Sequence, residues 1–147
     1  MSPLKLSLAC WDYDRTRALA DGSVRPEGIE LTYLPLSVEE TFFRMMRHRE
    51  FDVSEMSLSS YVASLGAPEP PFIAIPVFPS RCFRHSGIFV SEKSGIREPK
   101  DLVGKRVGTP EFQLTAPVWI RGILADEYQV PVSSVEYFLG GQEQAGR

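Results

Sequence analysis

The sequence contains few of the residues on which disulfide-rich and metal-binding proteins depend. Its 147 residues include two cysteines, Cys10 and Cys82, and two histidines. Two cysteines do not make a disulfide framework, so we expect free thiols and a cytoplasmic protein. Cys82 and His85 have metal-binding spacing, but a structural zinc site needs a second such pair, which the sequence lacks.

Long apolar runs and an excess of positive charge are also missing. No apolar run approaches the roughly 20 residues that a membrane-spanning helix needs. The 16 Lys and Arg residues against 19 Asp and Glu residues give a net charge of −3, which disfavours nucleic-acid binding. The first residues, MSPLKLSLACWDYD, have neither the long apolar region nor the cleavage site of a secretion signal. We therefore expect neither a membrane nor a nucleic acid as a partner.

What the chain does contain is a regular alternation of strand and helix patterns. Period-two apolar segments predict strands at 4–10, 28–36, 52–57, 72–78, 86–92, 105–107 and 134–141. Helical patterns lie at 15–22, 37–51, 57–66, 98–103 and 115–130. Apolar residues make up 43% of the sequence, which is ordinary for a globular protein. The alternation is typical of an α/β fold with a mostly parallel sheet.

Several of these helices have start signals and an apolar face. Ser37, three residues before Glu40, is typical of a capping box, and we expect Thr115 to be an N-cap. Apolar side chains at helical spacing predict the faces that are buried. These are Val38, Phe42, Met45 and Met46 on the first, Leu58, Tyr61, Val62 and Leu65 on the second, and Ala116, Trp119, Ile120, Ile123 and Leu124 on the third.

Polar side chains gather where the expected strands end, which is where open α/β sheets bind ligands. The four groups are Trp11, Asp12, Tyr13, Asp14 and Arg15; Glu55, Ser57 and Ser59; Arg81, Arg84 and His85; and Thr109, Glu111 and Thr115. Two groups lead into helix N-termini, which attract anions, and arginines beside them suit a carboxylate. Together they predict a site for a small anionic ligand held between aromatic rings and helix ends.

Each of these residues also has a purely structural interpretation. The serines could cap helices, Trp11 and Tyr13 could be core rings, and Arg81 and Arg84 could be surface charges. Asp12 and Asp14 could cap the helix that follows them, or could hold a divalent cation with water. We expect no protein-ligated metal, and the absence of a G-x-S-x-G motif argues against a nucleophilic triad.

Five segments carry a resemblance to a known family. IREPKDLVGKRVGTPE is similar to the entry into the second lobe of type 2 periplasmic-binding-protein folds. Together the following segments closely resemble the 4,5-dihydroxyphthalate decarboxylase family: LSLACWDYDRTRAL, VEETFFRMMRHREFDVSEMSLSSYV, FIAIPVFPSRCFRHSGIFV and GTPEFQLTAPVWIRGILADEY. The resemblance implies a two-lobed α/β fold with mixed, mostly parallel sheets, of which this chain would be the truncated N-terminal part. Residues 1–90 would form an incomplete first lobe and residues 91–147 the start of the second.

The resemblance also implies a function in phthalate degradation, a branch of aromatic catabolism. The family removes one carboxylate from 4,5-dihydroxyphthalate without oxidation and leaves 3,4-dihydroxybenzoate, and no organic cofactor is expected. In this fold the turn at 11–15 would face the ligand cleft. From residue chemistry we assign the proton donor to His85, phenolic proton acceptance to Asp12, Asp14 or Glu55, and carboxylate binding to Arg15, Arg81 and Arg84. By itself the 147-residue chain would be an inactive carboxy-lyase, and a homo-oligomer is left open for the full-length form.

Two other classes of protein share the implied fold. A solute-binding protein of an ABC-type transporter would capture the anion without chemistry, but the missing secretion signal favours the enzyme. A cytosolic ligand sensor, or a synthase of pyrimidine biosynthesis, is the other alternative. Such a synthase should have a site rich in histidine or cysteine, and this sequence has two of each.

Overall fold

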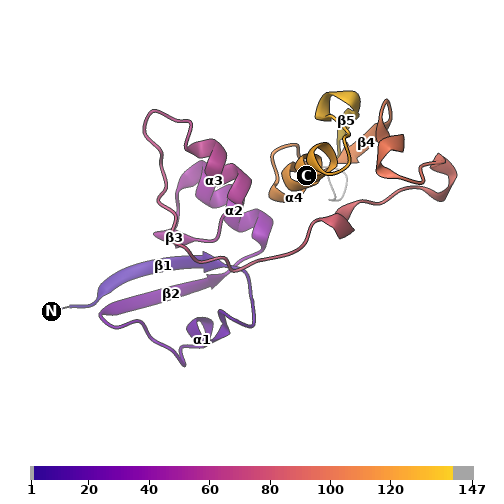
Figure 1. Ribbon diagram of the computed structural model, residues 1–147. Helices are drawn as coiled ribbons and strands as arrows, with labels where there is room; N and C mark the ends of the chain where they lie inside the picture. Colours follow the sequence, from indigo (N-terminus) through magenta and orange to yellow (C-terminus); the bar gives the residue numbers. More distant parts are fainter. Residues whose placement is uncertain (1, 141–147) are drawn as a thin grey trace. The chain divides into compact units, whose positions relative to one another are not determined.

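The computed structural model describes residues 2–140, and these residues form two compact units with parallel strands in each (Figure 1). Of the described residues, the first unit comprises 2–57 and 70–81, and the second comprises 58–69 and 82–140. The expected lobe boundary near residue 90 stays a prediction, and residues 141–147 of the second expected lobe lie outside the described residues. The expected α/β class and the parallel strand pairing are confirmed.

A parallel sheet in the order β2-β1-β3 forms the first unit. The strands are β1 (Leu4–Cys10), β2 (Ile29–Pro35) and β3 (Val53–Ser54), and the helices are α1 (Arg17–Ala20) and α2 (Val38–His48). β1 pairs along its whole length with β2, from Leu4 opposite Ile29 to Cys10 opposite Pro35. Because β1 is the central strand, its end is buried, with Ala9 at 0% and Cys10 at 3% exposure.

Helix α2 follows its sequence signals closely. The Ser37 side chain accepts a hydrogen bond from the Glu40 backbone, as the capping box predicts. Arg49 ends the helix in the left-handed conformation, with φ of 53°. The face predicted to be buried is half-buried, and Thr41 beside it is fully buried.

The second unit has a smaller parallel sheet of two strands. Its elements are α3 (Leu58–Ser64), β4 (Arg106–Thr109), α4 (Thr115–Asp126) and β5 (Glu136–Leu139), with short 3-10 turns at His85–Gly87, Glu92–Ser94, Pro99–Leu102 and Val132–Ser134. β4 pairs with β5 from Arg106 opposite Glu136 to Thr109 opposite Leu139. The core of this unit is a cluster of Leu102, Leu124, Val130 and Val135.

The strands expected at 72–78 and 86–92 are not formed, and both segments are irregular. Their large side chains are open to solvent, with Ile73 95% and Phe89 90% exposed. A strand forms only when a neighbour accepts and donates its backbone hydrogen bonds, and no strand in residues 2–140 pairs with these segments. The period-two pattern was therefore not sufficient for either strand.

The expected faces of α3 and α4 are partly wrong. Leu58, Val62 and Leu65 are between 43% and 56% exposed, and the buried residue of α3 is Ser60. On α4, Leu124 is buried as expected, whereas Trp119 is 54% exposed. Helical spacing identifies an apolar stripe, but the contacts made by each helix decide which residues are covered.

No helix within the described residues has the length and apolarity to cross a membrane.

We expect Leu124→Ala to lower the free energy of unfolding of the second unit by about 2–5 kcal/mol, because it opens a cavity in the buried cluster. Chemical denaturation followed by circular dichroism measures the change. Val118→Ala, on the same helix at 39% exposure, is the control and should change stability by about 0.5 kcal/mol or less. Equal effects of the two substitutions would contradict the described core.

Candidate functional site

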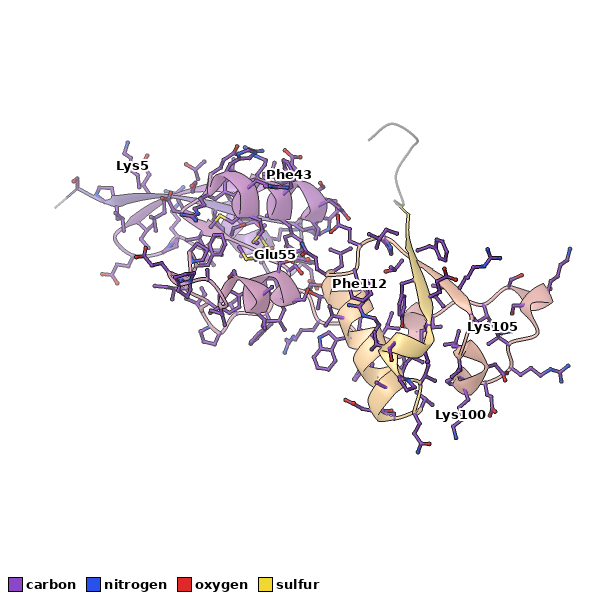
Figure 2. All side chains as sticks on the ribbon, turned by 90° about the horizontal axis from the view of Figure 1, so that it is seen from above. Lys5, Phe43, Glu55, Lys100, Lys105 and Phe112 are labelled. Atoms are coloured by element: carbon purple, nitrogen blue, oxygen red, sulfur yellow. The ribbon has the colours of Figure 1, made fainter. Side chains whose placement is uncertain are left out.

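A buried carboxylate lies at the carboxyl end of the first sheet. Glu55 directly follows β3, and its backbone N–H donates to the carbonyl of Ala9 at 2.9 Å. This bond extends the pairing of β3 with β1 by one residue and fixes Glu55 beside the end of β1. Glu55 is only 9% exposed and lies within the first unit (Figure 2).

Three donors surround the Glu55 carboxylate, all from the end of β1 and the turn after it. The Tyr13 hydroxyl donates at 2.7 Å, the Trp11 backbone N–H at 3.3 Å and the Cys10 thiol at 3.6 Å. Three predicted site residues, Trp11, Tyr13 and Glu55, are thus brought together. The Trp11 side chain is 43% exposed, so it is not a core ring.

Tyr33 is a member of this group that the sequence did not reveal. Its hydroxyl donates to the Trp11 carbonyl at 3.1 Å and contacts the Thr16 hydroxyl at 3.0 Å. The available signal was the strand register, because Tyr33 on β2 lies opposite Leu8 of β1, close to where the turn begins. Tyr33 therefore holds the turn from the other side of the central strand.

Burial changes the acidity of two groups around Glu55. It raises the pKa of the Cys10 thiol to about 11, with the nearby Glu55 charge adding to the effect. Burial also raises the pKa of Tyr13 to about 12, assisted by the hydrogen bond to Glu55 and by its charge. Both groups are neutral at pH 7, so Cys10 is no nucleophile and Tyr13 is a neutral hydrogen-bond donor.

Arg15 covers the outer side of Tyr13. Its guanidinium carbon lies 4.5 Å from the centre of the Tyr13 ring, and its Nε donates to the Pro79 carbonyl. Its Nη1 also forms an ion pair with Asp14 at 2.8 Å. Arg15 thus places a positive charge, paired with Asp14, against the Tyr13 ring.

Asp12 and Asp14 do not join the buried carboxylate. Asp12 forms a 3.7 Å ion pair with Arg17, and the two aspartate side chains are 60% and 84% exposed. Neither aspartate caps α1, since its N-cap is Thr16 and no side chain makes a capping bond there. Among residues 2–140, no three His, Cys, Asp or Glu side chains come together in a way that could hold a metal ion.

In the second unit, the starts of α3 and α4 meet. The Ser59 backbone N–H donates to the Thr115 hydroxyl at 3.3 Å, and the two hydroxyl oxygens are also 3.3 Å apart. Thr115 is not the N-cap that the sequence predicted, because the N-cap is Leu114 and Thr115 is the first helical residue. Ser57 is buried and directly precedes α3.

The remaining candidates of the second unit are His85, Thr109 and Glu111, and His85 lies away from this meeting point. His85 is exposed, and its Nε2 lies 3.6 Å from Glu127 at the C-terminal end of α4. Since α4 has 12 residues, this end lies about 18 Å from Thr115. Thr109 is buried and donates to the backbone carbonyl of Glu111 at 3.4 Å, while the Glu111 side chain is exposed.

The two remaining arginines lie close to the point in the sequence where the chain passes from the first unit to the second. Arg81, the last residue of the first unit, is exposed. Arg84 is half-buried and precedes the 3-10 turn at His85–Gly87, without a side-chain capping bond. Neither arginine forms an ion pair with a described carboxylate.

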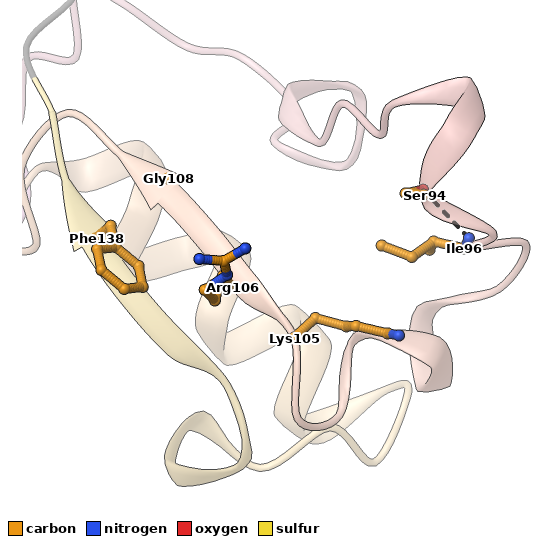
Figure 3. Close-up of a pocket in the computed structure, with 6 residues that line it drawn as sticks. All are labelled: Ser94, Ile96, Lys105, Arg106, Gly108 and Phe138. Atoms are coloured by element: carbon orange, nitrogen blue, oxygen red, sulfur yellow. Dashed lines mark hydrogen bonds between the residues drawn. The ribbon is translucent and has the colours of Figure 1, made fainter.

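A shallow depression of about 480 Å³ lies on the β4–β5 sheet (Figure 3). Its lining residues are Ser94, Ile96, Lys105, Arg106, Gly108 and Phe138. None of them was a predicted site residue. The lining includes two cations, Lys105 and Arg106, but no buried polar side chain.

Comparison with known proteins finds two relatives along the full chain. A 4,5-dihydroxyphthalate decarboxylase of Comamonas testosteroni is 48% identical over all 147 residues, which cover 44% of that protein. A 4,5-dihydroxyphthalate decarboxylase of Pseudomonas putida is 45% identical over 147 residues, which cover 57% of it. No family model matches the chain. The chain therefore spans about half the length of the curated relatives it matches.

We expect Glu55→Gln to lower the pKa of Tyr13 part of the way from about 12 toward its ordinary value of 10.0, because the substitution removes the charge but keeps an acceptor. Titration of ¹³C-labelled tyrosine by NMR, with Tyr13→Phe for assignment, measures the shift. Asp12→Asn is the matched control, since Asp12 is exposed and pairs with Arg17 instead. An unchanged pKa of Tyr13 in Glu55→Gln would show that the carboxylate does not act on this hydroxyl.

The free energy of unfolding should fall as the pH rises from about 9 to about 12. Over this range the unfolded Cys10 and Tyr13 lose their protons, whereas the folded chain retains them until about pH 11 and about pH 12. Below about pH 8 these two groups should contribute no pH dependence. Denaturant titrations at each pH should show a smaller loss in the Cys10→Ser/Tyr13→Phe double variant. If the double variant loses as much unfolding free energy at alkaline pH as the parent does, Cys10 and Tyr13 are not the source of that loss.

Proposed function

We propose that this chain, which is homologous to 4,5-dihydroxyphthalate decarboxylases along its whole length, takes part in the non-oxidative decarboxylation of 4,5-dihydroxyphthalate. The observation that carries the proposal is the 48% identity over all 147 residues. The products would be 3,4-dihydroxybenzoate and CO2. The reaction class would be that of a carboxy-lyase.

The substrate itself is activated for this reaction by its own hydroxyl groups. Each ring carboxylate is para to a hydroxyl, so loss of the phenolic proton pushes electron density onto the carbon that bears the carboxylate. A proton added to that carbon interrupts the aromatic ring and gives a dienone. The carbon–carbon bond then breaks, its electron pair restores the aromatic ring, and CO2 leaves. One proton is consumed per turnover, and no electron acceptor is needed.

The Tyr13–Glu55 pair is suited to accept the phenolic proton of the substrate. In our proposal the substrate hydroxyl donates to the Tyr13 oxygen, while the Tyr13 proton moves along its 2.7 Å hydrogen bond to Glu55. A relay of this kind never requires a free tyrosinate, which fits a hydroxyl with a pKa near 12. The exposed ring of Trp11 would stack on the substrate ring, and the Arg15 guanidinium would attract a carboxylate.

His85 is our proposed donor of the proton to the ring carbon. Imidazole is suited to proton transfer near neutral pH. The Glu127 carboxylate lies 3.6 Å from Nε2 and would orient the ring. Arg81 and Arg84, close to His85 in the sequence, are the further candidates for carboxylate binding.

We expect His85→Gln to slow turnover by about 10²–10⁴-fold while binding of the substrate is largely kept. The test protein is a chimera in which this chain replaces the matching segment of the Comamonas testosteroni relative, and the readouts are CO2 release and 3,4-dihydroxybenzoate formation. His48→Gln is the control, because His48 is the other histidine of the chain and is exposed at the end of α2. Glu55→Gln should also slow turnover if the relay operates.

Each outcome of this experiment has a definite meaning. A chimera that binds 4,5-dihydroxyphthalate tightly but forms no product would overturn the decarboxylase and would favour a binding protein or sensor for the same anion. Normal turnover by the His85→Gln chimera would keep the enzyme but assign the ring proton elsewhere. Normal turnover by Glu55→Gln would remove the relay from the mechanism.

A further inference from the structure

Arg121 on α4 is a buried arginine that has no counter-ion among the described residues. Arg121 is 8% exposed, and no carboxylate in residues 2–140 lies within ion-pair distance of its side chain. Its Nη2 donates to the Phe112 carbonyl, whereas its Nη1 is buried and has no hydrogen-bond partner among the described residues. This arginine was not among the predicted site residues.

The surroundings of Arg121 are aromatic. Its guanidinium carbon lies 3.6 Å from the centre of the Phe112 ring and 5.8 Å from that of Tyr137. Ring faces attract a cation, but they do not supply the acceptor that a buried N–H needs. Burial lowers the pKa of Arg121, which reflects the unfavourable placement of the charge. A buried charge without a partner destabilises a fold strongly.

The guanidinium lies beside the N-terminal turn of α4. Arg121 is the seventh residue of this 12-residue helix, and helical side chains lean toward the N-terminus. Its bond to Phe112 shows that it reaches the segment just before the N-cap, Leu114. Leu114 makes no side-chain capping bond, so the positive end of the helix dipole is not neutralised by a capping group.

We propose that Arg121 and the N-terminal turn of α4 form a carboxylate-binding site, in which the anion accepts a hydrogen bond from Nη1. Without the anion, the Phe112 ring covers the guanidinium. The proposal takes its ligand class, an aromatic carboxylate, from the proposed function. It explains why a charge is kept at a position that the fold would fill more favourably with an apolar residue.

Phe112 lies outside the buried core, although its ring meets edge-on, at 5.6 Å between centroids, the ring of Tyr137, which packs against that core. Phe112 lies in the irregular segment between β4 and α4, it is 44% exposed, and it does not belong to the buried cluster around Leu124. In the proposal the Phe112 ring moves outward, and Nη1 becomes accessible to the ligand. The carboxylate then replaces the ring contact with a charge-assisted hydrogen bond.

The test is a titration of the 147-residue chain with phthalate, followed by calorimetry and by the melting temperature. We expect Arg121→Met to weaken phthalate binding by at least about 10-fold, because a charge-assisted bond is lost. Without ligand this variant should melt at the same temperature as the parent or higher, since an uncompensated buried charge has been removed. Arg106→Met removes an exposed cation from the same unit and should leave binding unchanged.

Parent-like phthalate binding by Arg121→Met, or no phthalate binding by the parent chain, would overturn the site. If Arg121→Met does not fold, Arg121→Lys keeps the charge but loses the planar donor group, so its affinity should fall about 3- to 10-fold. Unchanged affinity in Arg121→Lys would then overturn the site. The proposed function fails separately, through absence of product from the wild-type chimera, whatever Arg121 does.

Discussion

The turn that follows the central strand depends on one buried carboxylate. A charge removed from water must find donors, and Glu55 obtains them from the Tyr13 hydroxyl, the Trp11 backbone and the Cys10 thiol. These donors belong to β1 and its turn. Their hydrogen bonds to Glu55 therefore fix the path of the chain after the strand. The exposed ring of Trp11 and the charge of Arg15 are consequently held at the carboxyl end of the sheet, where α/β proteins bind ligands.

The two units handle buried charge in different ways. In the first, Glu55 accepts three hydrogen bonds, and the neighbouring hydroxyl and thiol stay protonated at pH 7. In the second, Arg121 is buried against rings and one of its donors has no acceptor among the described residues. The hydrogen bonds of the first arrangement are formed without a ligand, and in our proposal this arrangement transfers a proton. In our proposal an added anion stabilises the second, which is the property of a binding group.

Much of the first unit was predictable from its sequence, because local signals agree there. The alternation in β1 and β2, the Ser37 capping box and the position of Glu55 after a strand all lead to the described structure. The strands expected at 72–78 and 86–92 failed because strand formation depends on a neighbour. Arg121 was missed because an arginine on an otherwise apolar helix gives no signal until its burial is known.

In the proposed reaction the Tyr13–Glu55 pair meets the phenolic hydroxyl of the substrate. The most direct measurement is the ¹³C NMR resonance of Tyr13 in the chimera during titration with 4,5-dihydroxyphthalate, compared with phthalate, which lacks the hydroxyls. We expect a saturable shift of the Tyr13 resonance with the dihydroxy compound and a much smaller shift with phthalate. Saturable binding of 4,5-dihydroxyphthalate that leaves the Tyr13 resonance in place would contradict it.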